Sequence, residues 1–405
     1  MTSTLDELDV ADRKVLLRLD LNTPMSGPAV SDVGKIQACL PTLAALLDRG
    51  AAVIVCSHLG RPAGRPDARY SLAPVAAALA RLIGQPVALA ADVAGPDARA
   101  MAAVLRPGSI MMLENLRFDA AETSKDCADR AAFADRLAEL ADLYVSDAFG
   151  VLHRPHASVC ELPARLPHAA GYLVTAEVGA LSRLTGAVAR PYAIVAGGAK
   201  VADKLPLLRS LALRADDLIV GGAMATAFLA AAGHPAGASL LPADLSEPRR
   251  CLSDIRSAGP RLTLPSDFVT ARSVSGDAPV YVVPADRIPA SQMALDIGPE
   301  TRDLFRARLS EARTVFWNGP MGVFEVPRYA AGTLAVAHAI ADCPGFTVIG
   351  GGDTAAAVRA LGFGPDDFGH ISTGGGASLE FLAGKQLPGL VALQEPALDH
   401  VEEHI

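Results

Sequence analysis

Short runs of apolar residues recur along the whole chain, and an amphipathic stretch follows most of them. The runs are KVLLRLDLN, AAVIVCSH, SIMMLENLRF and DLYVSDAFG in the first half, then YAIVAGGAK, DLIVGGAMA, RLTLPSDFV, YVVPAD, TVFWNGPMG and FTVIGGGDT. Intervening segments such as LPTLAALLDRG have the spacing of helices with one buried face. Apolar strands that alternate with helices are typical of parallel sheets covered on both faces. Because the pattern occurs twice, it predicts an α/β protein with two doubly wound domains.

The boundary between these domains is predicted at a connecting helix. AAGYLVTAEVGALSRLTGAV has a helical pattern, and Arg190-Pro191 then begins a new strand. We therefore expect an N-terminal domain over residues 1–172, a linking helix over 173–189 and a C-terminal domain over 190–390. The 405 residues suffice for two domains of about 200 residues each.

Composition and charge exclude several classes of protein. The net charge of −8 argues against a general nucleic-acid binder, which carries a basic surplus. The first residues, MTSTLDELDVADRK, lack the basic start and apolar core of a secretory signal, and no apolar stretch is long enough to cross a membrane. The 6 cysteines include no CxxC pair, which favours free thiols in a reducing cytosol. We expect a cytoplasmic protein with neither nucleic-acid nor membrane partners.

Charged and polar residues follow the strands of the first half. They are Asp20, Asn22, His58, Arg61, Arg117 and Arg154. Ligands of open α/β sheets bind outside the carboxyl ends of the strands, and guanidinium groups match the oxygens of carboxylates and phosphates. Surface ion pairing is the alternative for any single arginine. The placement of Arg61, Arg117 and Arg154 at strand ends favours a site for a small anion.

A metal site is a second interpretation of the same region. His153, His156 and Cys160 carry metal-ligating side chains within one short segment. Zinc needs a fourth ligand or an open water position, and no further residue has a suitable spacing. The sequence therefore favours the anion site.

Strands of the second half end in glycine instead, in AGGAK, GGAM, NGPMG and GGGDT. Exposed backbone N–H groups at such turns suit the phosphates of a nucleotide. Neither GxxxxGK[ST] nor GxGxxG occurs in a suitable place, which excludes a P-loop and an ordinary dinucleotide site. In GGAKVADK, Lys204 is expected near the positive end of a helix, where an anion would offset the repulsion. Asp353 could cap a helix or hold a magnesium ion that bridges phosphates.

These motifs, in this order, resemble the phosphoglycerate kinase family. SHLGRP, MLENLRF, GGAKVADK, WNGPMGVFE, GGGDTAAAV and STGGGASLE carry the resemblance, which covers nearly the whole chain. It implies two Rossmann-like domains joined by a hinge helix, with residues 391–405 returning toward the N-terminal domain. It also implies a monomeric phosphotransferase with a carboxyl group as acceptor. The reaction would be reversible phosphoryl transfer between 1,3-bisphosphoglycerate and magnesium ADP, giving 3-phosphoglycerate and ATP, in glycolysis, gluconeogenesis or carbon fixation.

The resemblance assigns roles to individual residues. Those implied to bind the phosphoglycerate are Asp20, Asn22, Lys35, His58, Arg61, Arg117 and Arg154. Those implied to bind the nucleotide are Lys200, Gly222, Ala223, Asn318, Pro320, Glu325, Gly351, Gly352, Asp353 and Thr354. Glu325 would hold the ribose and Asp353 the Mg²⁺. Those implied to act on the transferring group are Lys35, Lys200, Lys204, Gly375 and Gly376, with Gly374 in the same loop.

The chain departs from the family pattern near the expected ligands. Lys35 stands where the family has an arginine, which keeps the charge but loses the planar fork. GVLHRPH replaces GTAHRAH around Arg154, Ala223 adds a methyl group where the base would pack, and Gln292 replaces a tryptophan. Two alternatives follow: a catalytically weakened paralogue that binds nucleotide or phosphoglycerate, and a kinase for another small carboxylic acid.

Overall fold

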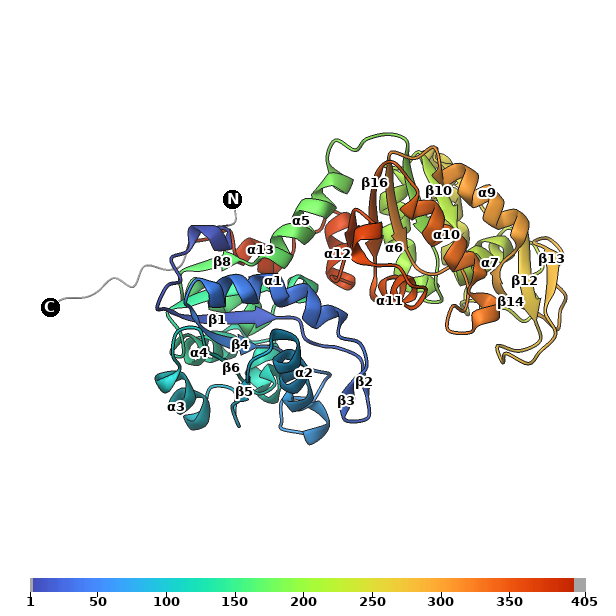
Figure 1. Ribbon diagram of the computed structural model, residues 1–405. Coiled ribbons are helices and arrows are strands. Elements are labelled where there is room, and N and C mark those ends of the chain that lie inside the picture. Colours follow the sequence, from blue (N-terminus) through green and yellow to red (C-terminus); the bar gives the residue numbers. More distant parts are fainter. Residues whose placement is uncertain (1–2, 397–405) are drawn as a thin grey trace. The chain divides into compact units, whose positions relative to one another are not determined.

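The computed structural model describes residues 3–396, apart from the side chain of Asp203 (Figure 1). The chain divides into two compact units. Unit 1 holds the chain up to Gly179 and the described residues from Gln386 onward, and unit 2 is Ala180–Lys385. Most of the acidic tail, from residue 397 on, lies outside the described residues, and with it most of the expected segment 391–405.

Unit 1 is built on a six-stranded parallel sheet with the order β5-β6-β4-β1-β7-β8. The central strands are buried on both faces, as their continuous apolar runs predict. A short antiparallel pair, β2 (Met25–Ser26) and β3 (Ala29–Val30), lies outside this sheet. The strands of the sheet are β1 (Lys14–Leu19), β4 (Ala52–Cys56), β5 (Ala88–Leu89), β6 (Ile110–Met112), β7 (Leu143–Asp147) and β8 (His168–Ala170).

Helices connect the strands of unit 1. At the end of β7, Asp147 Oδ1 accepts the N–H groups of Leu173 and Val174, at 2.8 and 3.2 Å, and so caps the first turn of α5. Helix α5 starts in unit 1 and ends in unit 2. The helices are α1 (Gly34–Asp48), α2 (Ala73–Ile83), α3 (Pro96–Val104), α4 (Cys127–Ala138), α5 (Tyr172–Thr185) and, after unit 2, α13 (Pro388–Ala392).

Unit 2 repeats this plan with a second six-stranded parallel sheet, in the order β11-β10-β9-β15-β16-β17. Its strands are β9 (Tyr192–Ala196), β10 (Asp217–Val220), β11 (Arg261–Thr263), β15 (Thr314–Asn318), β16 (Phe346–Gly350) and β17 (His370–Ile371). Its helices are α6 (Val201–Ala212), α7 (Gly222–Ala231), α8 (Ser246–Ala258), α9 (Pro299–Leu309), α10 (Ala331–Ala341), α11 (Gly352–Ala360) and α12 (Gly376–Leu382).

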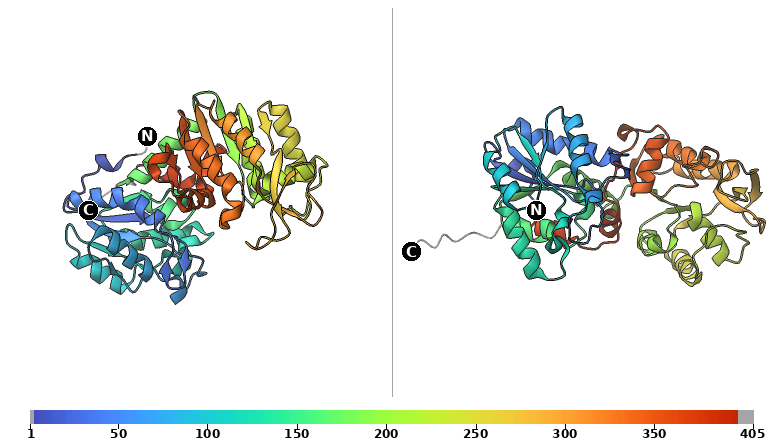
Figure 2. Two further views of the ribbon diagram at one scale, coloured as in Figure 1. Left: turned by 45° about the vertical axis from the view of Figure 1, so that its right-hand side comes forward. Right: turned by 90° about the horizontal axis from the view of Figure 1, so that it is seen from below.

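Helices cover both faces of each parallel sheet (Figure 2). In unit 2, α6 and α7 both contact α8, whereas α10 contacts α9 and α11. The first set connects the strands on one side of β9, namely β10 and β11, and the second set connects those on its other side, β15, β16 and β17. The predicted fold class, two doubly wound α/β units with parallel sheets, is confirmed. None of the described helices is both long and apolar enough to span a membrane.

Not every apolar run of the second half enters the parallel sheet. RLTLPSDFV supplies β11 and then β12 (Asp267–Ala271), which pairs antiparallel with β13 (Tyr281–Pro284) and β14 (Met293–Ile297). Strand β13 is an edge strand with Tyr281 and Val282 exposed, and it ends in a proline. The apolar pattern could not separate these antiparallel strands from parallel ones, because short apolar runs carry no sign of pairing direction.

The core of unit 2 offers a direct test of the packing. Phe305 is completely buried beside Ile297 and Trp317. We expect Phe305→Ala to lower the free energy of unfolding by about 3–5 kcal/mol, through lost apolar burial and the cavity left behind. Because Trp317 is the sole tryptophan of the chain, its fluorescence during urea unfolding reports on this core. Leu213→Ala is the control, since Leu213 is 75% exposed, and a similar loss in both variants would contradict the assignment.

Candidate active site

The predicted anion site of unit 1 lies at the carboxyl ends of its parallel strands. A cavity of about 290 Å³, here called the basic pocket, is lined by Arg61, Pro62, Ala63, Gly64, Arg117, Thr123, Arg154 and His156. Three of the predicted arginines therefore meet in one cavity. The described residues that line it include no carboxylate.

Arg117 is the most constrained cation of the basic pocket. It lies in a short turn (Leu116–Phe118) after β6, and its Nη1 donates to the carbonyl of Gly60 at 2.6 Å. Burial, helped by the nearby cations Arg154 and Arg18, lowers the pKa of Arg117 to about 10. Its buried Nε has no hydrogen-bond partner among the described residues. An anion in the pocket would supply that partner and relieve the repulsion between the arginines.

Asp20, Asn22 and Lys35 are grouped at the end of β1 and the start of α1, and they are not among the residues that line the basic pocket. Lys35 Nζ donates to Asp20 Oδ2 at 2.7 Å, so the lysine that replaces the expected arginine is already neutralised by a carboxylate. Asn22 Oδ1 accepts the N–H of Gly60 at 3.0 Å, which fixes the amide beside the loop that Arg117 holds.

His58 follows β4 and is only 2% exposed. Its Nδ1 lies 3.3 Å from Nη2 of Arg18, a completely buried arginine of β1. Burial first, and then the charges of Arg18 and Arg117, hold the pKa of His58 well below its usual range. Burial and Arg117 likewise lower the pKa of His156 to about 3, so both imidazoles are neutral at pH 7.

The residues behind the basic pocket were not predicted from the sequence. Arg18, Glu122 and Ser158 are buried polar residues of unit 1, and they come from three distant parts of the chain. A charged residue within the apolar run KVLLRLDLN was a visible signal for Arg18. His156 belongs to the HRPH segment expected at the anion site, and it lines the basic pocket. Among the described residues, no group of three or more His, Cys, Asp or Glu side chains could hold a metal ion.

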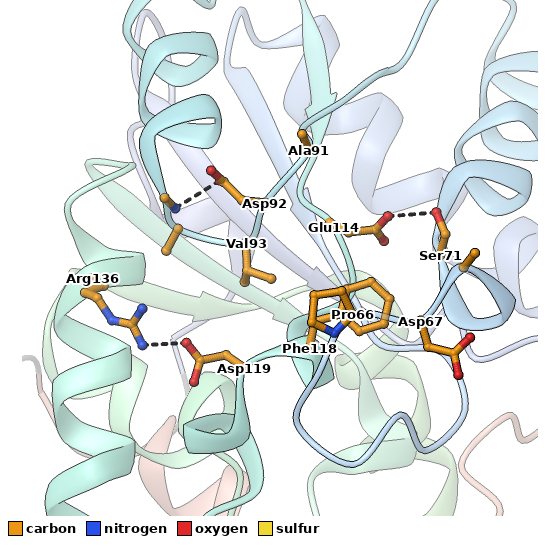
Figure 3. A pocket seen from close by; sticks show the side chains of 13 residues that line it. Pro66, Asp67, Ser71, Ala91, Asp92, Val93, Glu114, Phe118, Asp119 and Arg136 are labelled. Atoms are coloured by element: carbon orange, nitrogen blue, oxygen red, sulfur yellow. Dashed lines mark hydrogen bonds and ion pairs between the residues drawn. The ribbon is translucent and has the colours of Figure 1, made fainter.

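A second cavity of unit 1, of about 510 Å³, is lined by four carboxylates, and Figure 3 shows the partners of three of them, Asp92, Glu114 and Asp119. Glu114 accepts from Ser71 Oγ at 2.7 Å, Asp119 from Arg136 at 2.6 Å, and Asp92 from the backbone at the start of α3. Asp67 likewise accepts from Arg69. These carboxylates serve as caps and ion-pair partners, so the cavity has no evident role in anion chemistry.

In unit 2, backbone segments pack directly against one another where the strands end. At Gly222, φ is +59° and an added Cβ would lie 2.7 Å from the backbone nitrogen of Gly198. At Gly319, φ is +105° and an added Cβ would overlap the carbonyl of Gly197. Only glycine fits such positions. The glycine-rich strand ends therefore bring three loops together and leave backbone groups facing the ligand side.

A cavity of about 300 Å³, here called the base slot, lies beside these loops. Five of the predicted nucleotide residues line it: Gly222, Ala223, Pro320, Glu325 and Asp353. Its apolar walls come from Leu240, Phe268, Met321 and Phe324, which the sequence reasoning missed because they are scattered among loops and an antiparallel strand. A flat aromatic base with a polar sugar suits this lining.

Gln292 supports the base slot from outside. Its Oε1 accepts the hydroxyl of Thr270 at 2.5 Å, and its carbonyl accepts the N–H of Ala238 at 2.8 Å. The Ala294 N–H donates to Ser239 Oγ at 2.9 Å. Gln292, which stands where the family pattern has a tryptophan, thus links two segments: it joins the loop containing Leu240 to the antiparallel sheet.

A larger cavity of about 730 Å³, here called the phosphate pocket, adjoins the base slot, since Asp353 lines both. The predicted residues that line it are Lys200, Lys204, Asn318, Gly351, Gly352, Asp353, Thr354, Gly375 and Gly376. Asn318 is 5% exposed, and its Oδ1 has no hydrogen-bond partner among the described residues. Thr354 Oγ1 accepts the N–H of Gly319 at 2.7 Å, so its hydroxyl also ties α11 to the neighbouring loop.

Lys204 lies in the first turn of α6, and Lys200 is the residue before that helix. The Nζ of Lys204 donates to the carbonyl of Gly197 at 3.0 Å. Burial lowers the pKa of Lys204 to about 8, Asp353 opposes this shift and Lys200 adds to it. A half-buried cation at the positive end of a helix is unfavourable until an anion arrives.

The phosphate pocket also fits a magnesium ion. Asp353 is exposed in the first turn of α11, and its carboxylate has no hydrogen bond or ion pair with another described residue. Magnesium is commonly held by one or two carboxylates together with substrate phosphates and water, so a single free carboxylate is sufficient here.

One unit thus carries a cavity lined by three arginines, and the other carries the adjoining base slot and phosphate pocket. Such a pair of sites is typical of a phosphotransferase. The profile of the phosphoglycerate kinase family matches residues 5–385. The chain belongs to the phosphoglycerate kinase family.

Relatives and solved structures agree with this assignment. The phosphoglycerate kinase of Frankia casuarinae is 56% identical over 398 residues, which is 96% of this chain and 99% of that protein. That of Streptomyces coelicolor is 55% identical over 401 residues, which is 97% of this chain and 100% of that protein. The structure of phosphoglycerate kinase from Coxiella burnetii has a TM-score of 0.83 at 34% identity, covering 97% of this chain and 99% of that one. The enzyme from Pyrococcus horikoshii OT3 has a TM-score of 0.85 at 32% identity, covering 97% and 98%.

These comparisons support phosphoglycerate kinase as the function and favour neither the weakened paralogue nor a kinase for another acid. They leave the individual site residues as predictions.

The charge of Lys204 is expected to lower the stability of the protein without ligand. Lys204→Met is expected to raise the free energy of unfolding at pH 7 on the order of 1–2 kcal/mol, because it removes a half-buried cation. The pKa of Lys204 falls from an ordinary 10.5 to about 8 on folding, so the penalty is present below pH 8 and is lost as the pH rises toward 10.5. The stability gap between variant and wild type should therefore narrow above pH 8.

Urea unfolding followed by Trp317 fluorescence at pH 7 and pH 10 measures this gap. Lys200→Met is the control, because Lys200 is exposed and its removal relieves only the smaller repulsion on Lys204, so its effect on stability should be well below that of Lys204→Met. A gap for Lys204→Met that is absent at pH 7, or that stays constant up to pH 10, would contradict the argument.

Proposed function

We propose that this chain is a working phosphoglycerate kinase that transfers a phosphoryl group reversibly between 1,3-bisphosphoglycerate and ADP, giving 3-phosphoglycerate and ATP. The observation that carries the proposal is the positive charge of the basic pocket, where three arginines meet and the described lining residues include no carboxylate. Only a ligand with several negative charges suits such a pocket. A phosphoglycerate has both a carboxylate and a phosphate.

On the acceptor side, Arg61, Arg117 and Arg154 bind the anionic groups of the phosphoglycerate. Arg117 presents its unpartnered Nε to an oxygen of the ligand. Asp20 and Asn22 hold the hydroxyl end of the glycerate, and His58 donates a hydrogen bond to it. The rigid anchoring of Asn22 and Arg117 through Gly60 keeps these groups in place before the substrate arrives.

On the nucleotide side, the base enters the apolar base slot and Glu325 binds the ribose. The phosphates extend into the phosphate pocket, where Lys200, Asn318 and the N–H groups at Gly351 and Gly352 bind them. Asp353 holds the Mg²⁺, which when bound supplies charge neutralisation of the phosphate oxygens.

Transfer itself needs positioning and charge neutralisation more than covalent chemistry, because the phosphoryl group in transit is loose and metaphosphate-like. Lys204 and Lys35 stabilise its equatorial oxygens, together with the N–H groups of Gly375 and Gly376. The two sites belong to different units, so the reaction requires a step that brings donor and acceptor in line and excludes water. A monomeric state and a cytoplasmic location stay predictions from the sequence.

Turnover with 3-phosphoglycerate and MgATP tests the proposal directly, in an assay coupled to reduction of 1,3-bisphosphoglycerate by NADH. We expect robust turnover in the wild type and a loss of at least about 10²-fold in kcat/KM for Asp353→Ala, because a charge-neutralising group is removed from the phosphates. Asp303→Ala is the matched control, since Asp303 pairs with Arg306 on the exposed face of α9. Wild-type turnover no higher than that of Asp353→Ala would refute a working kinase.

Lys35 decides whether the chain is catalytically weakened. We expect Lys35→Met to lower kcat on the order of 10²-fold, as for one lost transition-state donor, and Lys35→Arg to change kcat by less than about tenfold. The reason is that lysine already supplies the charge and reaches Asp20. Steady-state kinetics in both directions measure these effects. An increase of more than about 10²-fold in Lys35→Arg would favour the weakened paralogue instead.

A further inference from the structure

His58 rests on a buried polar network that has no direct access to a ligand. Arg18 is completely buried, and its Nε donates to Ser158 Oγ at 3.0 Å while its Nη1 donates to the carbonyl of Leu19. Its remaining Nη2 lies 3.3 Å from Nδ1 of His58. All three nitrogens of the guanidinium are therefore committed inside the protein.

Glu122 is the counter-charge of this arginine. It is completely buried in a short turn (Ala120–Thr123), and its Oε1 lies 4.0 Å from Nη2 of Arg18. Ser158 joins the two, since its hydroxyl donates to Glu122 at 2.7 Å and its N–H donates to the other carboxylate oxygen at 3.0 Å. Tyr144 holds the Ser158 carbonyl at 2.8 Å. Burial raises the pKa of the Glu122 carboxyl, and the charge of Arg18 and the hydrogen bonds of Ser158 oppose this shift. Removal of one partner of the pair alone would therefore be costly.

The chemistry of the guanidinium determines the state of His58. Arginine has hydrogen-bond donors and no acceptor, so Nδ1 of His58 must accept. A neutral imidazole that accepts at Nδ1 carries its proton on Nε2. Nε2 is on the other side of the ring from Arg18, and it has no hydrogen-bond partner among the described residues.

We propose that the buried ion pair of Arg18 and Glu122 fixes His58 as a neutral imidazole protonated on Nε2, and hence as a permanent hydrogen-bond donor to the acceptor substrate. Arg18, Glu122 and Ser158 are then positioning residues, since none of them touches the substrate. The proposal rests on the proposed function only for the identity of that substrate.

The surroundings of His58 reinforce this state. The charged and titratable groups that face it are Arg18 from β1, Lys35 from α1, Arg117 from the turn after β6 and His156 after β7. All of them disfavour a second proton on the ring, and burial acts in the same direction. The ring therefore stays neutral over the whole physiological pH range, whereas an exposed histidine would gain a proton near pH 6.5.

Nitrogen-detected NMR of protein labelled with ¹⁵N-histidine reads the tautomer and the titration of His58 in the free protein. A His58→Gln variant assigns the signal among the 9 histidines. The wild type should show a proton on Nε2 and no titration between pH 5 and 9. In Arg18→Met/Glu122→Gln, which removes both charges while retaining similar volume, we expect a mixture of the two neutral tautomers and an upward shift of the titration midpoint by more than one pH unit.

Kinetics connect the network to the reaction. The same double variant should raise KM for 3-phosphoglycerate by about twofold, because only about half of the molecules then present the Nε2 donor, and leave KM for ATP unchanged. Arg130→Met/Glu161→Gln is the control, because it removes another largely buried ion pair of unit 1, with a distance of 2.6 Å, and should leave the His58 signal and both KM values as in the wild type.

A wild-type His58 protonated on Nδ1, or one that titrates near pH 6.5, overturns the proposal without any variant. So does a double variant that keeps the wild-type tautomer and KM. If the wild type shows the Nε2 proton but no turnover with 3-phosphoglycerate, the proposed function fails while the assignment of His58 stands.

Discussion

The direct packing of backbone against backbone at the strand ends of unit 2 is the constraint on which the nucleotide site depends. Gly197, Gly222 and Gly319 leave no room for side chains, so three loops approach within van der Waals contact of one another. The carbonyl of Gly197 accepts a hydrogen bond from the Nζ of Lys204 at 3.0 Å. A methyl group at Gly319 would disturb the loop contact and also reach the space that this ammonium group occupies. The shape of the pocket and the position of its charge thus have one cause.

Both units hold positive charge that the protein itself does not neutralise, and this is costly in the absence of ligands. In unit 1 the cost appears as the lowered pKa of Arg117, and in unit 2 as that of Lys204. The units limit it differently. Unit 1 places a buried carboxylate, Glu122, behind the cations and away from the pocket, whereas unit 2 relies on the exposed Asp353, which is available to share a metal ion with the phosphates.

The sequence allowed the fold class to be predicted because hydrophobic periodicity is local information. It also allowed several residues that line the cavities to be predicted at strand ends, since polar residues and glycines that follow apolar runs must lie at the same edge of a parallel sheet. It could not give the antiparallel pairing of β12 with β13 and β14, which depends on partners far along the chain. Nor could it give the contact between Arg18 and Ser158, because the two residues are 140 positions apart and neither belongs to a recognisable motif.

Lys35 shows how a replacement at a reactive position can be tolerated. The ammonium group of Lys35 is paired with the carboxylate of Asp20, at the end of β1, at 2.7 Å. This ion pair holds the ammonium group in place. An arginine there could hold Asp20 with one nitrogen and keep others free for the phosphoryl group. A lysine has to share a single nitrogen between the two, although its three hydrogens permit this. The change therefore reduces the number of donors and preserves the charge. Since Lys35 is also among the cations that face His58, that charge keeps its second effect of holding the imidazole neutral.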